Sequence, residues 1–264
     1  MIETNKRAWD TYWRDFREQP IGEFARLTLN EYRRVVSRIL DINALKLVVE
    51  AGSGGGVTSI PFMEAKAKSV LIDISAEALK VARNLFLAFG LEDRAHLVVG
   101  DVLHIPVRDS CADLVFNQGV LEHFNGDKSV KILKEMKRIG RTVMVLVPYR
   151  INVGYQLARF LCKALRRPWP FGGTIERDYT EEILVRELRK AGLAPVFMKK
   201  WGHTWALKHL LVIISSNPTI AKSSKKRPIV ERIAYMLARV LSALTLSFEQ
   251  LLAVCIKYPT KKSL

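Results

Sequence analysis

The chain has 264 residues, enough for one large α/β domain or for one domain with added segments. Its apolar fraction of 49% is ample for a buried core and excludes wholesale disorder, and its three cysteines (Cys111, Cys162 and Cys255) lie too far apart for a disulfide framework or a zinc site. The net charge of +16 is unevenly distributed, because residues 150–264 hold 21 Lys and Arg against 7 Asp and Glu. We therefore expect the second half of the chain to meet a negatively charged ligand or surface. A basic surface that is merely solvated is the alternative.

The N-terminal stretch "MIETNKRAWDTYWRDF" is polar and aromatic. It has no apolar core of the kind that a secretory signal needs, so we predict no signal peptide. With the separated cysteines, this favours the cytoplasm. Residues 1–34 are expected to form a helical segment of their own.

Strand and helix patterns alternate from residue 35 onward. Five apolar runs predict strands buried on both faces: 45–50, 67–74, 95–101, 112–118 and 141–148. Between the second and third, Ser75 can cap a helix that Gly90 ends, and residues 125–140 form another helical pattern. Alternating strands and helices predict a doubly wound, mostly parallel sheet.

The pattern changes after the fifth strand. Residues 153–173 predict a basic amphipathic helix that stops at Pro168, and a second helix runs from a Thr180 cap to Gly192. Two apolar runs follow, 194–201 and 205–216, close enough in sequence to form an antiparallel pair. Residues 217–228 are a polar, basic linker.

The segment 229–257 contains no Pro or Gly and predicts one or two amphipathic helices within a C-terminal extension over 229–264. Its polar face is a narrow stripe along Arg232, Arg239, Gln250 and Lys257. Charges at Arg239 and Glu249 leave too short an apolar stretch to span a bilayer. The open alternatives are packing against the domain or a second subunit, and lying on the inner face of a membrane with the basic flanks assisting.

The stretch "LVVEAGSGGGVTSI" offers backbone N–H groups and a helix start to a ligand. A phosphate-binding P-loop needs GxxxxGK[ST], and no Lys follows here before Lys66. A dinucleotide fingerprint needs GxGxxG, whose third glycine would fall on Val57 or Ser59. Spacing therefore disfavours both kinds of site.

What is present is Glu50-x-Gly52-x-Gly54-x-Gly56, followed 17 residues later by Asp73 at the end of the second strand, by Asp101 in "GDVLHIP" and by "NQGVLEHF" after the fourth strand. These pieces resemble the class I S-adenosylmethionine-dependent methyltransferases, in particular the small-molecule group called type 11, over about residues 40–216. The resemblance implies a Rossmann-like, seven-stranded sheet with an antiparallel last strand. It places the methyltransferase domain at 35–216, with 150–178 as a basic insertion near the acceptor.

The resemblance also assigns the cofactor, S-adenosylmethionine, which leaves as S-adenosylhomocysteine, and it implies no metal. Glu50 is expected near the methionine amino group, Asp73 at the ribose hydroxyls and Asp101 at the adenine edge. The full set of cofactor-binding residues is Glu50, Gly52, Ser53, Gly54, Gly56, Asp73, Ile74, Asp101, Val102, Asn117 and Gln118. Acids and close backbone approach suit a sulfonium cation better than phosphate-binding lysines do.

Methyl transfer proceeds by in-line displacement and depends mainly on alignment, with a base needed only for a weakly nucleophilic acceptor. His123 is a candidate base, with a packing role as its alternative. Candidates for the acceptor pocket are Trp9, Tyr12 and Trp13, in a segment that could form a lid, and Tyr149, Arg150, Glu176, Arg177 and Tyr179.

The favoured function is methyl transfer to a small or lipid-like molecule, with a membrane surface or a second subunit as a partner of 229–257. The alternative is an RNA methyltransferase that uses the basic second half on tRNA or rRNA. Against it, the chain has "NQGV" after the fourth strand instead of an Asn-Pro-Pro-Tyr motif, and no recognisable RNA-binding module. A scaffold that binds the cofactor without catalysis is the third hypothesis.

Overall fold

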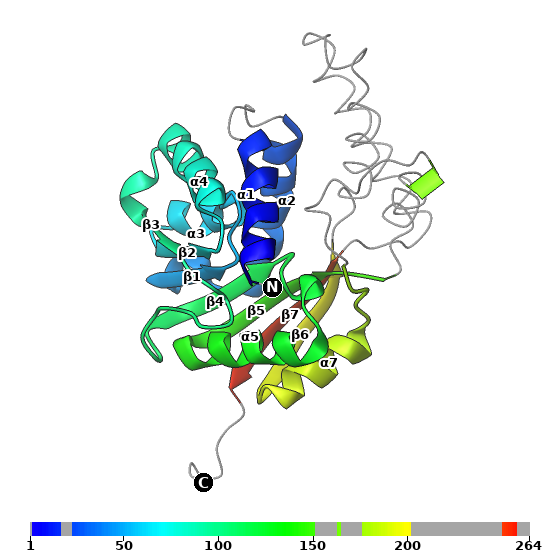
Figure 1. Cartoon of the computed structure of the whole chain (residues 1–264). Helices are drawn as coiled ribbons and strands as arrows, with labels where there is room; N and C mark the ends of the chain where they lie inside the picture. Colours follow the sequence, from blue (N-terminus) through cyan, green and yellow to red (C-terminus); the bar gives the residue numbers. More distant parts are fainter. Residues whose placement is uncertain (1, 17–22, 151–162, 165–175, 202–249, 258–264) are drawn as a thin grey trace.

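The computed structural model describes residues 2–16, 23–150, 163–164, 176–201 and 250–257 (Figure 1). The strands are β1 (Leu47–Ala51), β2 (Lys68–Asp73), β3 (Ala95–Val99), β4 (Ala112–Gln118), β5 (Gly140–Pro148), β6 (Leu193–Trp201) and β7 (Gln250–Lys257). The helices are α1 (Ile2–Phe16), α2 (Glu23–Ile39), α3 (Ile60–Glu64), α4 (Ala76–Phe89), α5 (Gly126–Ile139) and α7 (Glu181–Lys190). Short 3-10 turns are η1 (Ile42–Ala44), η2 (Val57–Ser59), η3 (Glu92–Arg94) and η4 (Leu121–His123).

All seven strands join one sheet in the order β3-β2-β1-β4-β5-β7-β6. The first five are parallel to one another, while β7 runs antiparallel between β5 and β6. The predicted doubly wound, mostly parallel sheet with an antiparallel last strand is therefore confirmed.

Helices cover both faces of the sheet (Figure 1). Alternate residues of a strand point to opposite faces, so Val115 packs with α5 and α7, whereas Leu114 and Phe116 pack against α2. A third cluster joins α3 and α4 to Leu71 of β2. The predicted strands are continuously apolar because the side chains on both faces of the sheet are buried under helices.

The predicted helix boundaries agree with the caps in the structure. The Ser75 side chain accepts a hydrogen bond from the Ala78 N–H at the start of α4, and Gly90 ends that helix in the left-handed conformation. Thr180 caps α7 in the same way, through the Ile183 N–H. Local capping chemistry was sufficient to place these ends.

The predicted C-terminal helix over 229–257 is wrong for residues 250–257, which form β7. Leu252 and Val254 pack on one face of the sheet, and Ala253 and Cys255 pack on the other. The strand also pairs with β5 on one side and β6 on the other. Its backbone groups are therefore hydrogen-bonded while its side chains are buried in the core. β7 is the described neighbour of β6, and the sheet extends past the predicted domain boundary at 216.

The predicted boundary at residue 34 is also wrong, because α2 runs through it. Leu29, Tyr32 and Val36 of this helix are buried in the core, so α2 is part of the domain.

Several predictions lie outside the described residues: nearly all of the basic helix at 153–173, the run 205–216, the linker 217–228 and the segment 229–249. Among the described helices, none is both long and apolar enough to cross a membrane.

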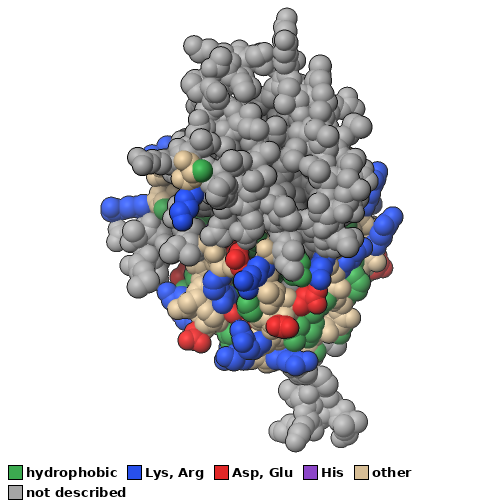
Figure 2. Space-filling view, turned by 90° about the vertical axis from the view of Figure 1, so that its right-hand side faces the viewer, with side chains coloured by type: hydrophobic (Ala, Val, Ile, Leu, Met, Phe, Trp, Pro, Cys, Tyr) green, Lys and Arg blue, Asp and Glu red, His purple; other side chains and the backbone are tan. Residues whose placement is uncertain are grey.

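The basic second half is described only in part. The described residues from 150 onward carry nine Lys and Arg against five Asp and Glu, a smaller excess than that of the whole segment. On the described part of the face shown in Figure 2, basic and acidic side chains are interspersed. In the described part of the second half, Lys200 of β6 is paired with Glu181 of α7 at 2.9 Å. This part of the surface has no single-sign patch of the kind that nucleic acids require.

Candidate functional site

The carboxyl ends of β1, β2 and β4 meet at one edge of the sheet. β1 is flanked by β2 on one side and β4 on the other, so the chain connections diverge around it. In open parallel sheets, ligands bind in the crevice at this switch point. The glycine loop follows β1, Asp73 ends β2, and Asn117 and Gln118 end β4, so the structure brings these predicted residues to the same edge.

The glycine loop is built so that a side chain would not fit at its turns. Gly52, Gly54 and Gly56 all have positive φ, at 78°, 50° and 73°. A Cβ on Gly52 would lie 2.5 Å from Val120 Cγ2, and one on Gly54 would lie 2.5 Å from Trp13 Cζ2. The loop therefore needs glycine both for its backbone conformation and for the contacts of that backbone.

Asp73 holds the loop in place through backbone hydrogen bonds. One carboxylate oxygen accepts from the Gly54 N–H at 2.7 Å, and the other accepts from the Ser75 N–H at 2.8 Å. Burial raises the pKa of Asp73, while the two backbone donors act in the opposite direction. The carboxyl thus links the end of β2, the glycine loop and the start of α4.

Glu50 lies on the face of the sheet that α2 covers, and it is 2% exposed. Its carboxyl oxygens accept hydrogen bonds from the hydroxyls of Thr58 and Ser59, the latter at 2.5 Å. Burial raises the pKa of Glu50 to about 8, although these two bonds lower it. Near neutral pH, this side chain is held largely in its neutral form.

The raised pKa predicts that Glu50→Gln changes stability in a pH-dependent way. Because the pKa is about 8 in the folded protein against 4.5 normally, the contribution of Glu50 to stability is complete below about pH 4.5 and is lost as pH rises through 8. The amide has no charge to desolvate, so the free energy of unfolding of Glu50→Gln minus that of the unsubstituted protein should rise by on the order of 2–4 kcal/mol between pH 5 and pH 9.

Urea denaturation at both pH values measures this difference. Glu92→Gln is the matched control, because Glu92 is exposed in η3 and should give no such trend. A constant difference for Glu50→Gln across the range would contradict the prediction.

The remaining predicted cofactor residues are positioned as follows. Asp101 accepts the Leu103 N–H at 2.9 Å and so shapes the turn after β3, while the Val102 side chain packs into the core. Ser53 is 8% exposed, and its hydroxyl has no hydrogen-bond partner within the described residues. Ile74 is half-buried beside Asp73.

The two predicted residues of β4 differ in exposure. Asn117 is fully buried, and its amide donates to Met136 Sδ of α5 at 3.4 Å, which directs it toward the α5 face. Gln118 is half-buried at the end of the strand. Nothing in these positions tests the cofactor roles of the two side chains, which stay predictions.

Helix α1 lies across the glycine loop. The Trp13 ring contacts Gly54 and Gly55, and the Ser75 hydroxyl donates to Asp10 Oδ1 at 2.6 Å. Sequence reasoning selected Trp13 but missed Asp10, since a lone acid on a polar helix carries no local signal.

The aromatic residues of α1 continue the site toward η4. Trp9 meets the His123 ring edge to face at 5.1 Å between centroids, and Tyr12 lies between Trp9 and Trp13 at 5.7 and 5.2 Å. Burial lowers the pKa of His123 to about 4, so the ring is neutral, as a base or a packing residue would be. Burial, with the nearby charge of Glu176, raises the pKa of Tyr12.

Arg177 and Tyr179 belong to a network beneath this cluster. The guanidinium donates to Glu187 Oε1 at 2.8 Å and to Ser129 Oγ at 3.1 Å, and it also contacts the Tyr179 hydroxyl. The Tyr179 hydroxyl donates to Glu187 Oε2 at 2.8 Å. These hydrogen bonds fix both side chains in position next to the site.

The predicted pair Tyr149 and Arg150 is tied to the same segment by its backbone. Tyr149 forms a parallel bridge with Tyr179, and the Arg150 N–H donates to the Tyr179 carbonyl at 2.9 Å. The Arg150 side chain is exposed, whereas the Tyr149 ring is half-buried beneath the Lys200 ammonium, 4.9 Å from its centroid.

Glu122 was not among the predicted site residues. It follows β4 in η4, is 3% exposed, and one of its carboxyl oxygens, Oε2, has no hydrogen-bond partner in the described part of the chain. Burial raises its pKa to about 8, and the negative charge of Glu176 adds to that effect. Only the packing around Glu122 distinguishes it from an ordinary surface acid.

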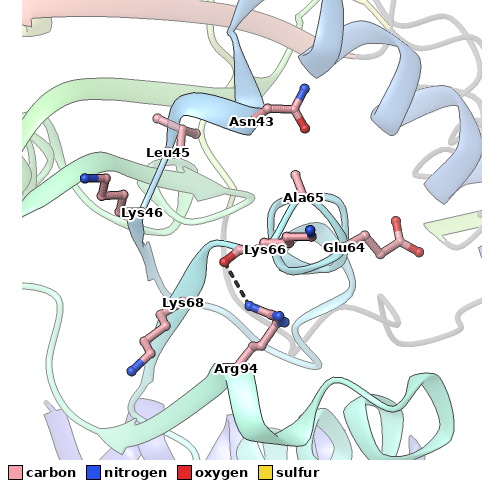
Figure 3. Close-up of a pocket in the computed structure, with 8 residues that line it drawn as sticks. All are labelled: Asn43, Leu45, Lys46, Glu64, Ala65, Lys66, Lys68 and Arg94. Carbon is pink, nitrogen blue, oxygen red and sulfur yellow. Dashed lines mark hydrogen bonds between the residues drawn. The ribbon is translucent and has the colours of Figure 1, made fainter.

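A basic hollow of about 650 Å³ lies at the opposite edge, near the amino ends of β1 and β2 (Figure 3). Lys46 and Lys68 extend to one side of it, whereas the Arg94 guanidinium donates to the Lys66 carbonyl at 2.9 Å. The cationic groups do not converge on a common point, and Glu64 is paired with Arg33 at 2.7 Å. The hollow is therefore separate from the site and lacks the arrangement of an anion-binding pocket.

Residues 48–142 match a protein family described as a methyltransferase domain. The chain is also similar to ajmaline N-methyltransferase of Rauvolfia serpentina, 40% identical over 78 residues, and to norajmaline N-methyltransferase of the same plant, 36% identical over 78 residues. Each match covers 28% of this chain and 26% of the relative, so the similarity spans about a quarter of those proteins.

Solved structures extend the similarity to most of the chain. Magnesium protoporphyrin IX methyltransferase from Synechocystis PCC 6803, with bound S-adenosylhomocysteine, has a TM-score of 0.58 at 13% identity and covers 94% of this chain and 93% of that one. Geranyl diphosphate C-methyltransferase from Streptomyces coelicolor A3(2) has a TM-score of 0.55 at 12% identity, covering 85% and 75%. The cyclase SpnF has a TM-score of 0.57 at 15% identity, covering 86% and 81%. At these identities the likeness shows the fold alone, and that fold also supports a cyclase.

Proposed function

We propose that this protein is an enzyme that transfers the methyl group of S-adenosylmethionine to a small-molecule acceptor, because residues 48–142 match a family described as a methyltransferase domain. The observation that carries the proposal is the glycine loop held by the buried Asp73 carboxylate at the switch point of the sheet. The spacing of the glycines, which disfavours a P-loop and a dinucleotide fingerprint, supports the same cofactor.

The residues at this edge fit the cofactor chemically. Gly52 and Gly54 carry no Cβ, and Val120 and Trp13 pack closely against these two positions, so the loop backbone is held in a tight turn beside the strand ends. The unpartnered Ser53 hydroxyl and the Asp73 carboxylate offer polar contacts to the ribose and methionine portions. When bound, the cofactor supplies an electrophilic methyl on a positively charged sulfur, and no described residue of the loop is a Lys or Arg that would repel it.

The chain's own part in the reaction is to bind, orient and exclude water. Asp73 fixes the loop against β2, and Trp13 covers Gly54 and Gly55. Trp9 and His123 form an aromatic wall at the neighbouring end of β4. Such alignment and desolvation are the main sources of rate in a displacement whose leaving group departs neutral.

Two measurements test the proposal. Calorimetry should detect binding of both S-adenosylmethionine and S-adenosylhomocysteine to the full chain. Incubation with methyl-labelled cofactor and a small-molecule cell extract should transfer the label to a product. Cofactor binding without any transfer would support a scaffold, and absence of binding would overturn the assignment.

We further propose that the acceptor is lipid-like and that the protein binds a membrane surface. The basic stretch 222–227 supports this proposal. The test must spare β7, so truncation before residue 250 is unsuitable. Replacing Lys225, Lys226 and Arg227 together by Ala should reduce flotation with vesicles that contain anionic lipid, by about 1 kcal/mol of binding for each charge removed. Equal flotation of the two proteins would reject the membrane interaction.

A further inference from the structure

We propose that Arg138 is a positioning residue for the adenine of S-adenosylmethionine, acting with Glu135 through the β3–β4 loop. We use that name for residues 100–111, which lead from β3 to β4 and contain Asp101 and Val102, the residues expected at the adenine edge. The inference rests on the proposed function and names a determinant of cofactor preference in that site. Three observations carry it: the lack of a helix in this loop, the hydrogen bonds of one guanidinium, and the attachment of the loop to the end of β2.

The β3–β4 loop is the first observation. The other connections between parallel strands run through helices: α3 between β1 and β2, α4 between β2 and β3, and α5 between β4 and β5. Residues 100–111 are all described and contain no helix. Backbone N–H and C=O groups that lose their water need hydrogen-bond partners, so in this loop some of those partners must be side chains.

Arg138, in the last turn of α5, supplies such partners and is the second observation. Its Nη2 donates to the Ile105 carbonyl and its Nη1 to the Val107 carbonyl, both at 2.8 Å. Nη1 also donates to Asp109 Oδ1 at 2.6 Å, while Nε and Nη2 donate to the two carboxyl oxygens of Glu135 at 3.0 and 2.9 Å. An arginine has five N–H donors, and these five bonds account for all of them, so the guanidinium is fully committed to the loop and to its partner acid.

Glu135 completes the attachment from one turn earlier in α5. Its Oε2 accepts the Ile105 N–H at 2.8 Å, so Ile105 is held through both its N–H and its C=O. The hydrogen bonds from Arg138 hold the pKa of Glu135 below its usual range, so the acid is charged at neutral pH. Charge-assisted and paired hydrogen bonds are both stronger and more narrowly oriented than neutral ones. The two side chains therefore fix the middle of the loop against α5.

The third observation connects the loop to the cofactor edge of the sheet. The Gly100 N–H, at the start of the loop, donates to the Asp73 carbonyl at 2.9 Å. A Cβ on Gly100 would lie 3.2 Å from Pro106 Cδ, so the middle of the loop folds back on its beginning. Asp101 follows Gly100, and its Oδ1 accepts the Leu103 N–H at 2.9 Å. The carboxyl of Asp101 is thus oriented by the same folded loop that the pair from α5 holds.

The consequence is selection of the base. A carboxylate accepts a hydrogen bond from the 6-amino group of adenine, whereas it repels the 6-oxygen of hypoxanthine. The preference between these bases depends on how firmly the carboxylate is held, because an acceptor that can turn aside avoids the repulsion and loses the bond. Loosening the loop should therefore reduce the preference as well as the affinity.

Calorimetry of the full chain with S-adenosylhomocysteine and with S-inosylhomocysteine, in which hypoxanthine replaces adenine, tests the inference without a known acceptor. We expect the unsubstituted protein to bind the adenine compound at least about tenfold more tightly, since a hydrogen bond to a charged group separates the two. Arg138→Lys keeps the charge but lacks the planar fork that reaches two carbonyls, so that preference should fall about fivefold. Arg94→Lys is the matched control, because Arg94 donates to the Lys66 carbonyl at 2.9 Å at the opposite edge of the sheet, and the preference should stay unchanged.

Glu135→Gln is a second variant that keeps the size of the side chain, and it should lower the preference in the same direction. Urea denaturation reports whether each variant is folded. A role in stability alone would weaken binding of both compounds equally, so an unchanged preference in either folded variant overturns the inference. Unfolding of both variants, or equal binding of the two compounds by the unsubstituted protein, overturns it as well. Failure of the unsubstituted protein to bind S-adenosylhomocysteine overturns the proposed function instead.

Discussion

Asp73→Ala is expected to lower the affinity for S-adenosylmethionine by at least about 100-fold, since hydrogen bonds to a charged group are worth about 1.5–3 kcal/mol each and two ribose hydroxyls would lose their acceptor. The substitution also frees the Gly54 and Ser75 N–H groups that the carboxylate holds at 2.7 and 2.8 Å. The substitution therefore removes both the anchor of the glycine loop and the acceptor that we propose for the ribose hydroxyls. Calorimetry with S-adenosylmethionine measures the effect.

Asp73→Asn separates the two roles, because it keeps the size of the side chain and one acceptor oxygen. Asp73→Asn should fold with a modest loss of stability, yet its affinity for the cofactor should still fall by at least about tenfold. Urea denaturation reports the folding of each variant, and Asp93→Asn, an exposed acid in η3, is the control. Unchanged affinity in a folded Asp73→Ala protein would remove the basis of the cofactor assignment.

Removing β7 is expected to abolish cooperative folding. A chain that ends at Glu249 lacks the strand that hydrogen-bonds to both β5 and β6, so two ladders of backbone donors and acceptors lose their partners. It also lacks Leu252, Ala253, Val254 and Cys255, which are 0–4% exposed and complete the core on both faces. These losses are of the same order as the total stability of a domain, about 5–15 kcal/mol.

Thermal denaturation followed by circular dichroism measures the outcome. A chain that ends at Lys257 is the matched control, because it keeps every described contact of β7, and it should unfold cooperatively. If the chain that ends at Glu249 melted as sharply and at the same temperature as the control, β7 would be dispensable and the sheet order would be wrong.

The part of the fold that the sequence predicts well is the part with local signals. β1 to β5 are continuous apolar runs because the sheet is buried on both faces, and Ser75, Gly90 and Thr180 mark helix ends by their own chemistry. The pairing of β6 has no such signal. Residues 205–216 and 250–257 are both apolar runs, and periodicity alone does not separate a short buried strand from part of an amphipathic helix.

The same division applies to the site. The glycine spacing and Asp73 are readable because their roles depend on residues that follow one another along the chain. Glu122 was not predicted, because its carboxyl differs from that of a surface acid only once burial in the fold removes water from it. Asp10 likewise gains its role from Ser75, 65 residues away. Sequence patterns report spacing, whereas desolvation is a property of the assembled fold.

The position of β7 also sets an order of events during synthesis. The ribosome releases β6 well before residues 250–257, yet β6 has no place in the sheet until β7 lies between it and β5. For that interval the edge of β5 is open and β6 is an unpaired strand, a state prone to pairing with other chains. We therefore expect the nascent protein to depend on chaperones until its final strand emerges, and to be most prone to aggregation when translation stalls between residues 201 and 250.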